Sequence, residues 1–386
     1  MKKFILTIAV LSLAFLLFLK FDSDTASVPE ASMPDAISPP QISANPNQKA
    51  KQDEPPKLPE IFRLTAPDEK KTLENEYHVF QTFNNCGPAS LSMVFSYYGI
   101  NKSQDELGRE LRPYQNQQGD NDDKSVTFEE LSQKAEEYGF TVYSRPNGDI
   151  ELLKLFISYD MPVIVKTLTK INEDIGHYRI VKGYDDATGE IIYDDSFQGK
   201  NLRFSYNSFN KLWEKFNFEY LVVVPKNKAM IAEAIIGRDL DEKKAWERAS
   251  GKARELAEKY PEDIYYRFNL SVALHNTGAF QESADEFEKA ENKLPFRALW
   301  YQTEPIQAYF ALGNYERVFY LTDKILNNHN KAFSELYLIR GEIYKIQGDM
   351  ASAKKEFEKA VFYNTGLASA KEALDSLVPQ QQNLSD

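Results

Sequence analysis

The most informative residues of this chain are Gln81-Thr82-Phe83-Asn84-Asn85-Cys86-Gly87-Pro88-Ala89-Ser90-Leu91, which place its single cysteine at the start of a predicted helix over 86–98. Pro88 suits the first helical turn, because N–H groups there have no helical partner. Those amides would stabilise a thiolate at Cys86 and could receive an oxyanion formed when it attacks a carbonyl. A lone cysteine in a globular domain is more commonly structural. This setting favours a nucleophile instead.

A nucleophilic thiolate needs a base and a group that orients the base. His177 opens a predicted strand, and Asp194 and Asp195 end the next strand, after turn residues at 185–189. Allowing for the turn, His177 lies within about two residues of the position that faces Asp195. The sequence therefore predicts a hydrogen-bonded histidine–aspartate pair. The alternative is a surface histidine beside acidic turn residues.

Residues 61–228 are predicted to form a mixed α/β domain. The capping boxes Ser103–Glu106 and Thr127–Glu130 predict two further helices after the one that begins at Cys86. Five short runs rich in β-branched and aromatic residues then predict strands. These runs are 140–143, 162–166, 177–183, 190–194 and 220–224.

The last third of the chain is predicted to be a helical solenoid. Gly278, Gly313 and Gly348 follow one another at intervals of 35 residues, with small and aromatic residues at fixed places around them. This pattern resembles the tetratricopeptide repeat, a helix-turn-helix unit of about 34 residues. We expect an all-α repeat domain over 241–378, with roughly three repeats and a capping helix near 367–377. An unrelated helical bundle is the alternative.

The N-terminal region is predicted to connect the folded domains to a membrane. Residues 1–21 hold a mostly apolar run of about 24 Å after Lys2 and Lys3, which reads as a signal anchor or a signal peptide. The two lysines place everything beyond it outside the cytoplasm, and the lack of a clear cleavage site favours the anchor. Residues 22–60 contain eight prolines and no aromatic residue, so we expect a disordered linker, with a removed pro-segment as the alternative.

Composition excludes several classes of function. The chain carries 46 lysines and arginines against 58 aspartates and glutamates, a net charge of −12, which argues against nucleic acid as a partner. A single cysteine excludes an intrachain disulfide framework and a cysteine-rich zinc site. The four histidines are scattered, and there is no glycine-rich nucleotide motif. We expect neither a metal nor a cofactor.

Four motifs agree in order and spacing with one family. They are the stretch around Cys86, Tyr97-Tyr98-Gly99, the run 176–184 with the sequence Gly-His-Tyr-Arg-Ile-Val-Lys-Gly-Tyr, and Tyr193-Asp194-Asp195-Ser196. Together they resemble the bacteriocin-processing, or double-glycine, cysteine peptidases and their relatives with a papain-like fold. The likeness covers roughly residues 77–225. It implies an α+β papain-like domain ahead of the repeats.

The resemblance also implies roles for individual residues. Cys86 becomes the nucleophile, and His177 the general base and later the general acid. Asp195 becomes the acid that orients His177, with Asp194 as the alternative. Ser196 stands where the family usually has proline.

The oxyanion donor is the remaining role that the resemblance implies. The family places a glutamine shortly before the cysteine, which corresponds to Gln81, five residues upstream. Because members of the family differ at this point, Asn84 and Asn85 stay open as alternatives.

We therefore expect an extracytoplasmic thiol peptidase that hydrolyses an amide of a peptide or protein through an acyl-enzyme thioester. Its repeat domain would recruit a protein partner, and its N-terminal segment would hold it at a membrane. The membrane spans and nucleotide-binding domain of the family's exporters are absent from the sequence, so cleavage after a Gly-Gly leader is not assumed. Two alternatives remain: an acyl transferase with the same triad, and a catalytically silent scaffold that binds peptides.

Overall fold

The computed structural model describes residues 64–114, 125–328 and 330–377. Residues 61–386 form one compact unit. The predicted signal segment and proline-rich linker lie outside the described residues. In the described part of the chain, every helix is too short or too polar to cross a bilayer.

An antiparallel sheet forms the centre of the first domain. Its strands follow the order β2-β7-β3-β4-β5-β6, and β1 pairs with the end of β4. Five strands match the five predicted runs; β1 and β6 are additional. The bounds are β1 Lys70–Thr72, β2 Thr141–Arg145, β3 Val163–Leu168, β4 Gly176–Asp185, β5 Glu190–Asp195, β6 Gly199–Ser205 and β7 Tyr220–Val224.

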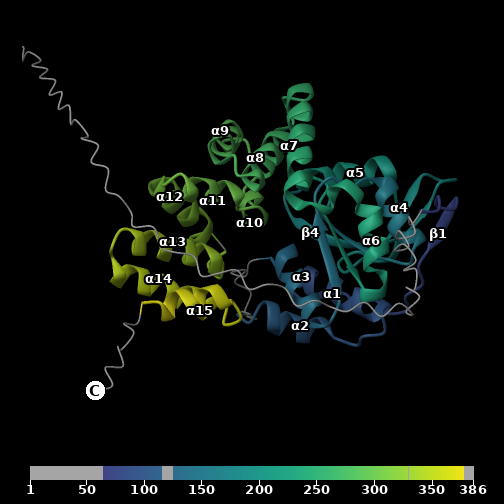
Figure 1. The fold of residues 1–386 in the computed structure, drawn as a ribbon, viewed down its shortest axis with the longest axis horizontal. Helices are drawn as coiled ribbons and strands as arrows, with labels where there is room; N and C mark the ends of the chain where they lie inside the picture. The colour runs from purple at the N-terminus through teal and green to yellow at the C-terminus, as the bar shows by residue number, and fades with distance from the viewer. Residues whose placement is uncertain (1–63, 115–124, 329, 378–386) are drawn as a thin grey trace, which may run out of the picture. The chain divides into compact units, whose positions relative to one another are not determined.

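Helices cover both faces of this sheet (Figure 1). Because side chains alternate along a strand, Val163 and Val165 of β3 join a core with α4, α5 and α6, whereas Ile164 joins a core with α1, α2 and α3. Burial on both faces explains why β3 and β7 read as continuous apolar runs. The bounds are α1 Cys86–Tyr97, α2 Gln104–Leu111, α3 Phe128–Glu137, α4 Ile150–Ser158, α5 Tyr206–Trp213 and α6 Ala229–Ile236, with short 3₁₀ turns at η1 Glu214–Phe216, η2 Lys226–Lys228 and η3 Gly237–Leu240.

The predicted helix starts are confirmed. Helix α1 begins at Cys86, and both predicted capping boxes are present. The Ser103 side chain caps α2, and the Thr127 side chain caps α3. These local signals fix where the helices that flank the site begin.

The C-terminal region consists of antiparallel helix pairs, as the repeat pattern predicts. Gly278, Gly313 and Gly348 have φ of 87°, 72° and 81°, and each allows the tight turn inside a pair. The predicted capping helix is α15. One helix is interrupted, because extended Gln302 separates α10 from α11. The bounds are α7 Glu242–Lys259, α8 Ile264–Thr277, α9 Phe280–Glu291, α10 Ala298–Tyr301, α11 Glu304–Ala311, α12 Tyr315–Leu326, α13 Ser334–Ile346, α14 Met350–Tyr363 and α15 Ala368–Asp375.

The repeats and the sheet domain are joined by hydrogen bonds that are buried or partly buried. Asn217 Nδ2 donates to the main-chain oxygen of Asn269 at 3.0 Å, and Asn269 Nδ2 donates to the main-chain oxygen of Glu214 at 2.6 Å. Lys166 Nζ of β3 donates to the main-chain oxygen of Tyr301 at 3.0 Å. Each domain therefore has polar groups whose hydrogen bonds are completed by the other domain.

Candidate active site

Cys86 is the first residue of α1 and is 6% exposed. The turn before it is held by Asn85, whose Oδ1 accepts from Arg112 at 2.8 Å and whose Nδ2 donates to Thr82 Oγ1 at 2.7 Å. The sulfur therefore lies at the positive end of the helix, where main-chain N–H groups can donate to an anion.

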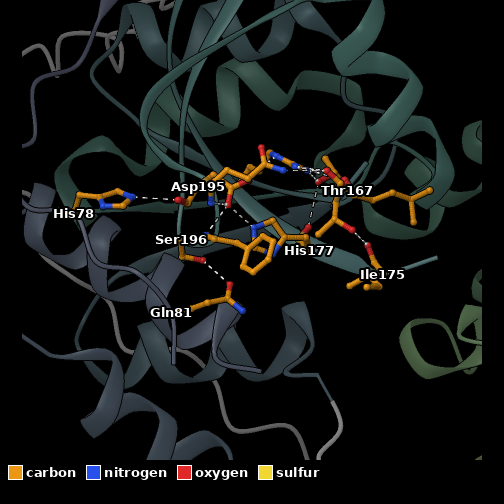
Figure 2. A network of polar contacts seen from close by, with 12 residues as sticks. His78, Gln81, Thr167, Ile175, His177, Asp195 and Ser196 are labelled. Carbon is orange, nitrogen blue, oxygen red and sulfur yellow. Dashed lines mark hydrogen bonds and ion pairs between the residues drawn. The ribbon is translucent and has the colours of Figure 1, made fainter. Parts of the chain in front are cut away.

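His177 and Asp195 form a buried pair. His177 Nε2 lies 2.8 Å from Asp195 Oδ1 (Figure 2). Asp195 faces Arg179 in the β4–β5 ladder, two residues from His177, which confirms the register expected from the sequence. With Nε2 engaged by the carboxylate, Nδ1 is the ring nitrogen left to interact with the thiol.

Electrostatics favour the protonated form of His177. Its burial acts to lower the pKa, but the hydrogen bond and charge of Asp195, together with those of Cys86, outweigh burial and raise it. The ring can therefore carry a proton beside the sulfur. A thiolate–imidazolium pair is the state from which a cysteine attacks an amide.

Asp195 is held in its ionised form. Burial opposes ionisation, yet the bond to His177 and the nearby charges of His177 and Arg179 lower its pKa to about 2. Its Oδ1 also accepts from the main-chain N–H groups of Phe197 and Gln198 at 2.7 and 2.9 Å. Arg179 Nε lies 3.0 Å from Oδ2 as an ion pair, although the N–H is not aimed well enough for a hydrogen bond.

Sequence reasoning missed Arg179. This side chain is 1% exposed, and its guanidinium also donates to the main-chain oxygens of Leu168 and Thr169 at 2.7 and 2.8 Å and to Thr167 Oγ1. The signal was its place two residues after His177, which puts both side chains on one face of β4. Arg179 thus holds the Asp195 carboxylate in place, and this carboxylate orients the His177 ring.

Asp194, the alternative acid, lies away from His177. Because neighbouring residues of a strand face opposite sides of the sheet, its Oδ2 pairs with Lys182 Nζ at 2.9 Å, and its Oδ1 accepts from the main-chain N–H of Asn201 at 2.8 Å. Asp195 is therefore the aspartate of this pair that contacts His177.

Gln81 is positioned from the β5 side of the site. Its main-chain N–H donates to the Ser196 oxygen at 2.7 Å, and Ser196 Oγ donates to its side-chain oxygen at 2.9 Å (Figure 2). The Gln81 amide nitrogen can still donate to another group. Asn85, in contrast, uses both ends of its side chain to hold the turn. Asn84 adopts a left-handed backbone, with φ of 56°.

Comparisons with known proteins agree with the motif-based resemblance. Residues 70–221, which include Cys86, His177 and Asp195, match the Peptidase C39 like family. Residues 334–361, within α13 and α14, match the tetratricopeptide repeat. The resemblance is thereby confirmed for these two segments: a C39-like peptidase domain precedes a helical region that contains such repeats. No curated protein matches the chain.

Solved structures with detectable similarity include a C39-like peptidase from Bacillus anthracis, 18% identical over 41% of this chain and 99% of that one, with a TM-score of 0.35. The peptidase domain of Streptococcus ComA, a bifunctional ABC transporter of a quorum-sensing pathway, is 27% identical over 38% and 97%, with a TM-score of 0.31. A double-glycine-motif protease from an AMS/PCAT transporter, solved with its leader peptide, is 17% identical over 40% and 94%, with a TM-score of 0.31.

Proposed function

We propose that this chain is an extracytoplasmic, membrane-tethered cysteine peptidase, with Cys86 as nucleophile, His177 as base and acid, Asp195 as the orienting acid and Gln81 as an oxyanion donor. The observation that supports it most is the buried 2.8 Å contact between His177 and Asp195, with Cys86 among the groups that raise the histidine pKa. The match of residues 70–221 to the Peptidase C39 like family supports a cysteine-peptidase type of function.

In the proposed acylation step, the Cys86 thiolate attacks the carbonyl carbon of a peptide bond. The new C–S bond pushes the carbonyl electron pair onto oxygen, where the Gln81 amide and the N–H groups at the start of α1 stabilise it. The His177 imidazolium gives its proton to the leaving amine as the C–N bond breaks. A thioester on Cys86 remains.

In the deacylation step, neutral His177 takes a proton from water, and the resulting hydroxide attacks the thioester carbon. The C–S bond breaks, the carboxylic acid product leaves, and the thiolate–imidazolium pair is restored. Asp195 holds the His177 ring in the same orientation in both steps, because Arg179 and two main-chain N–H groups keep the Asp195 carboxylate in place.

Location and partner recruitment are further parts of the proposal. The apolar segment 1–21 and the proline-rich stretch 22–60 support a tether that keeps the peptidase outside the cytoplasm. The repeat match over 334–361 supports recruitment of a protein partner, because stacked repeats of this kind present extended binding surfaces.

Comparing protein termini across the proteome tests the reaction. Cells that produce the native chain are expected to contain new termini that are missing in Cys86→Ala cells, and Asp194→Asn cells serve as a control with the triad intact. Identical termini in native and Cys86→Ala cells would favour the silent peptide-binding scaffold. Products joined to an added amine, in place of free acids, would identify an acyl transferase.

A further inference from the structure

A cleft of about 480 Å³ lies between the C39-like domain and the repeats. The peptidase side supplies the residues at the start of α3, including Val126 and Glu129, and Tyr178 of β4. The opposite side comes from α10, α11 and the first turns of α13 and α15, including Trp300, Tyr301 and Glu372. The repeats therefore form one wall of this cleft.

One end of the cleft lies beside Gly87, the residue that follows the nucleophile. A Cβ on Gly87, the residue after Cys86, would lie 3.2 Å from Val126 Cβ and 3.5 Å from the ring of Tyr178, and both residues line the cleft. Burial raises the pKa of Tyr178 and the charge of Cys86 adds to this rise, so the ring lies within electrostatic range of the sulfur. Val126 and Tyr178 therefore bring the cleft wall to within one residue of Cys86.

Tyr301 of the repeats stands at the same end. Its ring packs on Gly176, the residue before His177, so closely that a Cβ there would lie 2.9 Å from ring carbon Cδ1. Its main-chain oxygen is fixed by Lys166, and its ring meets Phe216 edge-on at 6.3 Å between centroids. Burial and the charge of Cys86 both raise its pKa. The interrupted helix α10–α11 thus brings a repeat residue beside the catalytic pair.

The charge of the cleft is mainly negative. The described lining holds four glutamates, Glu129, Glu130, Glu335 and Glu372, and one lysine, Lys166. Glu130 is engaged in the capping box of α3 and Glu335 also has a partner, so Glu129 and Glu372 carry the argument. The ammonium of Lys166 is already engaged by the Tyr301 oxygen and by Glu219 at 4.0 Å. Glu129 and Glu372 are exposed, one on each wall. Because low-dielectric walls focus the field of a charged cleft, and aromatic rings attract cations, the cleft favours a basic chain.

We propose that this cleft binds the substrate polypeptide as an extended segment carrying lysine or arginine, with Tyr301 contacting the chain beside the scissile bond and Glu129 and Glu372 selecting the basic residues. The inference rests on the proposed peptidase function, and it assigns the choice of substrate to the repeat domain as well as to the C39-like domain.

Binding to the full chain carrying Cys86→Ala tests the cleft without requiring turnover. The probes are two fluorescein-labelled peptides with the same length and glycine–serine spacing, one with lysines and one with glutamates. We expect the lysine peptide to bind at least about 10-fold more tightly at low salt, and high salt to narrow the difference. The double variant Glu129→Gln with Glu372→Gln should remove most of the difference in affinity between the two peptides. Tyr301→Ala should further weaken binding of the lysine peptide.

The matched control is Glu255→Gln with Glu282→Gln, which removes the same charge at exposed positions of α7 and α9. This pair should leave the preference unchanged. Equal binding of the two peptides, including binding of neither, overturns the inference, as does a preference that the control pair removes equally. Binding is measured on Cys86→Ala and does not depend on turnover. If the cleft selects the lysine peptide but the native chain shows no peptidase activity, the proposed function is rejected and the assignment of the cleft stands.

Discussion

Asp195 helps to raise the pKa of His177 through its hydrogen bond and its charge, so its replacement should change the pH dependence of the site. Asp195→Asn removes the negative charge that favours the imidazolium, and we expect it to lower the pKa of His177. The alkaline limb of peptide hydrolysis and the NMR titration midpoint of the His177 ring should therefore move to lower pH. Asp194→Asn is the matched control, because Asp194 pairs with Lys182. An unchanged midpoint in Asp195→Asn would contradict the assignment.

The same carboxylate links stability to pH. The pKa of Asp195 is about 2 in the folded chain, below its ordinary value of 3.8. Its contribution to the free energy of unfolding is therefore fully present above pH 3.8 and is lost as the pH falls through about 2. Acid unfolding monitored by circular dichroism should show Asp195→Asn losing less stability than the native chain over this window. An identical acid loss in both chains would contradict this linkage.

Ser196 holds the proposed oxyanion donor, so it should affect turnover more than binding. Ser196→Ala removes the hydrogen bond that fixes Gln81 Oε1, and we expect kcat to fall by about 10-fold with little change in KM. The measurement is steady-state kinetics on a peptide selected from a cleavage library. Ser196→Thr keeps the hydroxyl and should retain most activity. A rise in KM with unchanged kcat would contradict the role of Ser196 in positioning Gln81.

Much of the pairing geometry could be predicted from residue order, but not all of it. The turn at 185–189 set the register that brings Asp195 near His177. Strand alternation counted from the turn could not decide which of Asp194 and Asp195 lies on the same face as His177. A β-bulge between Val181 and Gly183 shifts the register by one residue before the ladder reaches the two aspartates. The contact between Ser196 and Gln81 joins residues 115 positions apart, and no local pattern announces it.

At the scale of elements, two glycines should respond in opposite ways to the same substitution. A Cβ on Gly341 would lie 2.3 Å from the ring of Phe357, so Gly341→Ala should disturb the packing of α13 on α14 and cost about 1–3 kcal/mol. Gly251, inside α7, has open space around it, and Gly251→Ala should stabilise by about 0.5–1 kcal/mol. Denaturant unfolding measures both. Equal effects would contradict the predicted close packing of the repeat helices.

Helices with capping boxes and strands buried on both faces could be predicted, because their signals are local. Strand β6 was missed although Leu202 and Phe204 alternate with polar residues along it. It lies at the sheet edge, where these two side chains are only half-buried, so the apolar signal is short. Strand β1 has only three residues, two of them lysines. The break between α10 and α11 was missed as well. It coincides with contacts of Tyr301 to the other domain, and tertiary contacts of this kind override helix propensity.

For the whole molecule, the hydrogen bonds between the domains should make them unfold together. Asn269→Ala removes the bond to the Glu214 oxygen across the interface, and we expect a loss of about 1–3 kcal/mol and partial separation of two transitions. Asn276→Ala is the control on the same helix, because its side chain bonds only within α8, to the oxygen of Val272. Calorimetry should show one transition for the native chain and for the control. Two transitions in the native chain would contradict the coupling.

The rate at which iodoacetamide alkylates Cys86 tests the nucleophile most directly, because the chain has a single cysteine. An ordinary thiol with a pKa of about 8.5 reacts slowly between pH 6 and 7. We predict rapid labelling of the native chain in this range, and markedly slower labelling of His177→Ala. Equally slow labelling of both proteins would contradict the thiolate–imidazolium pair and, with it, the proposed peptidase.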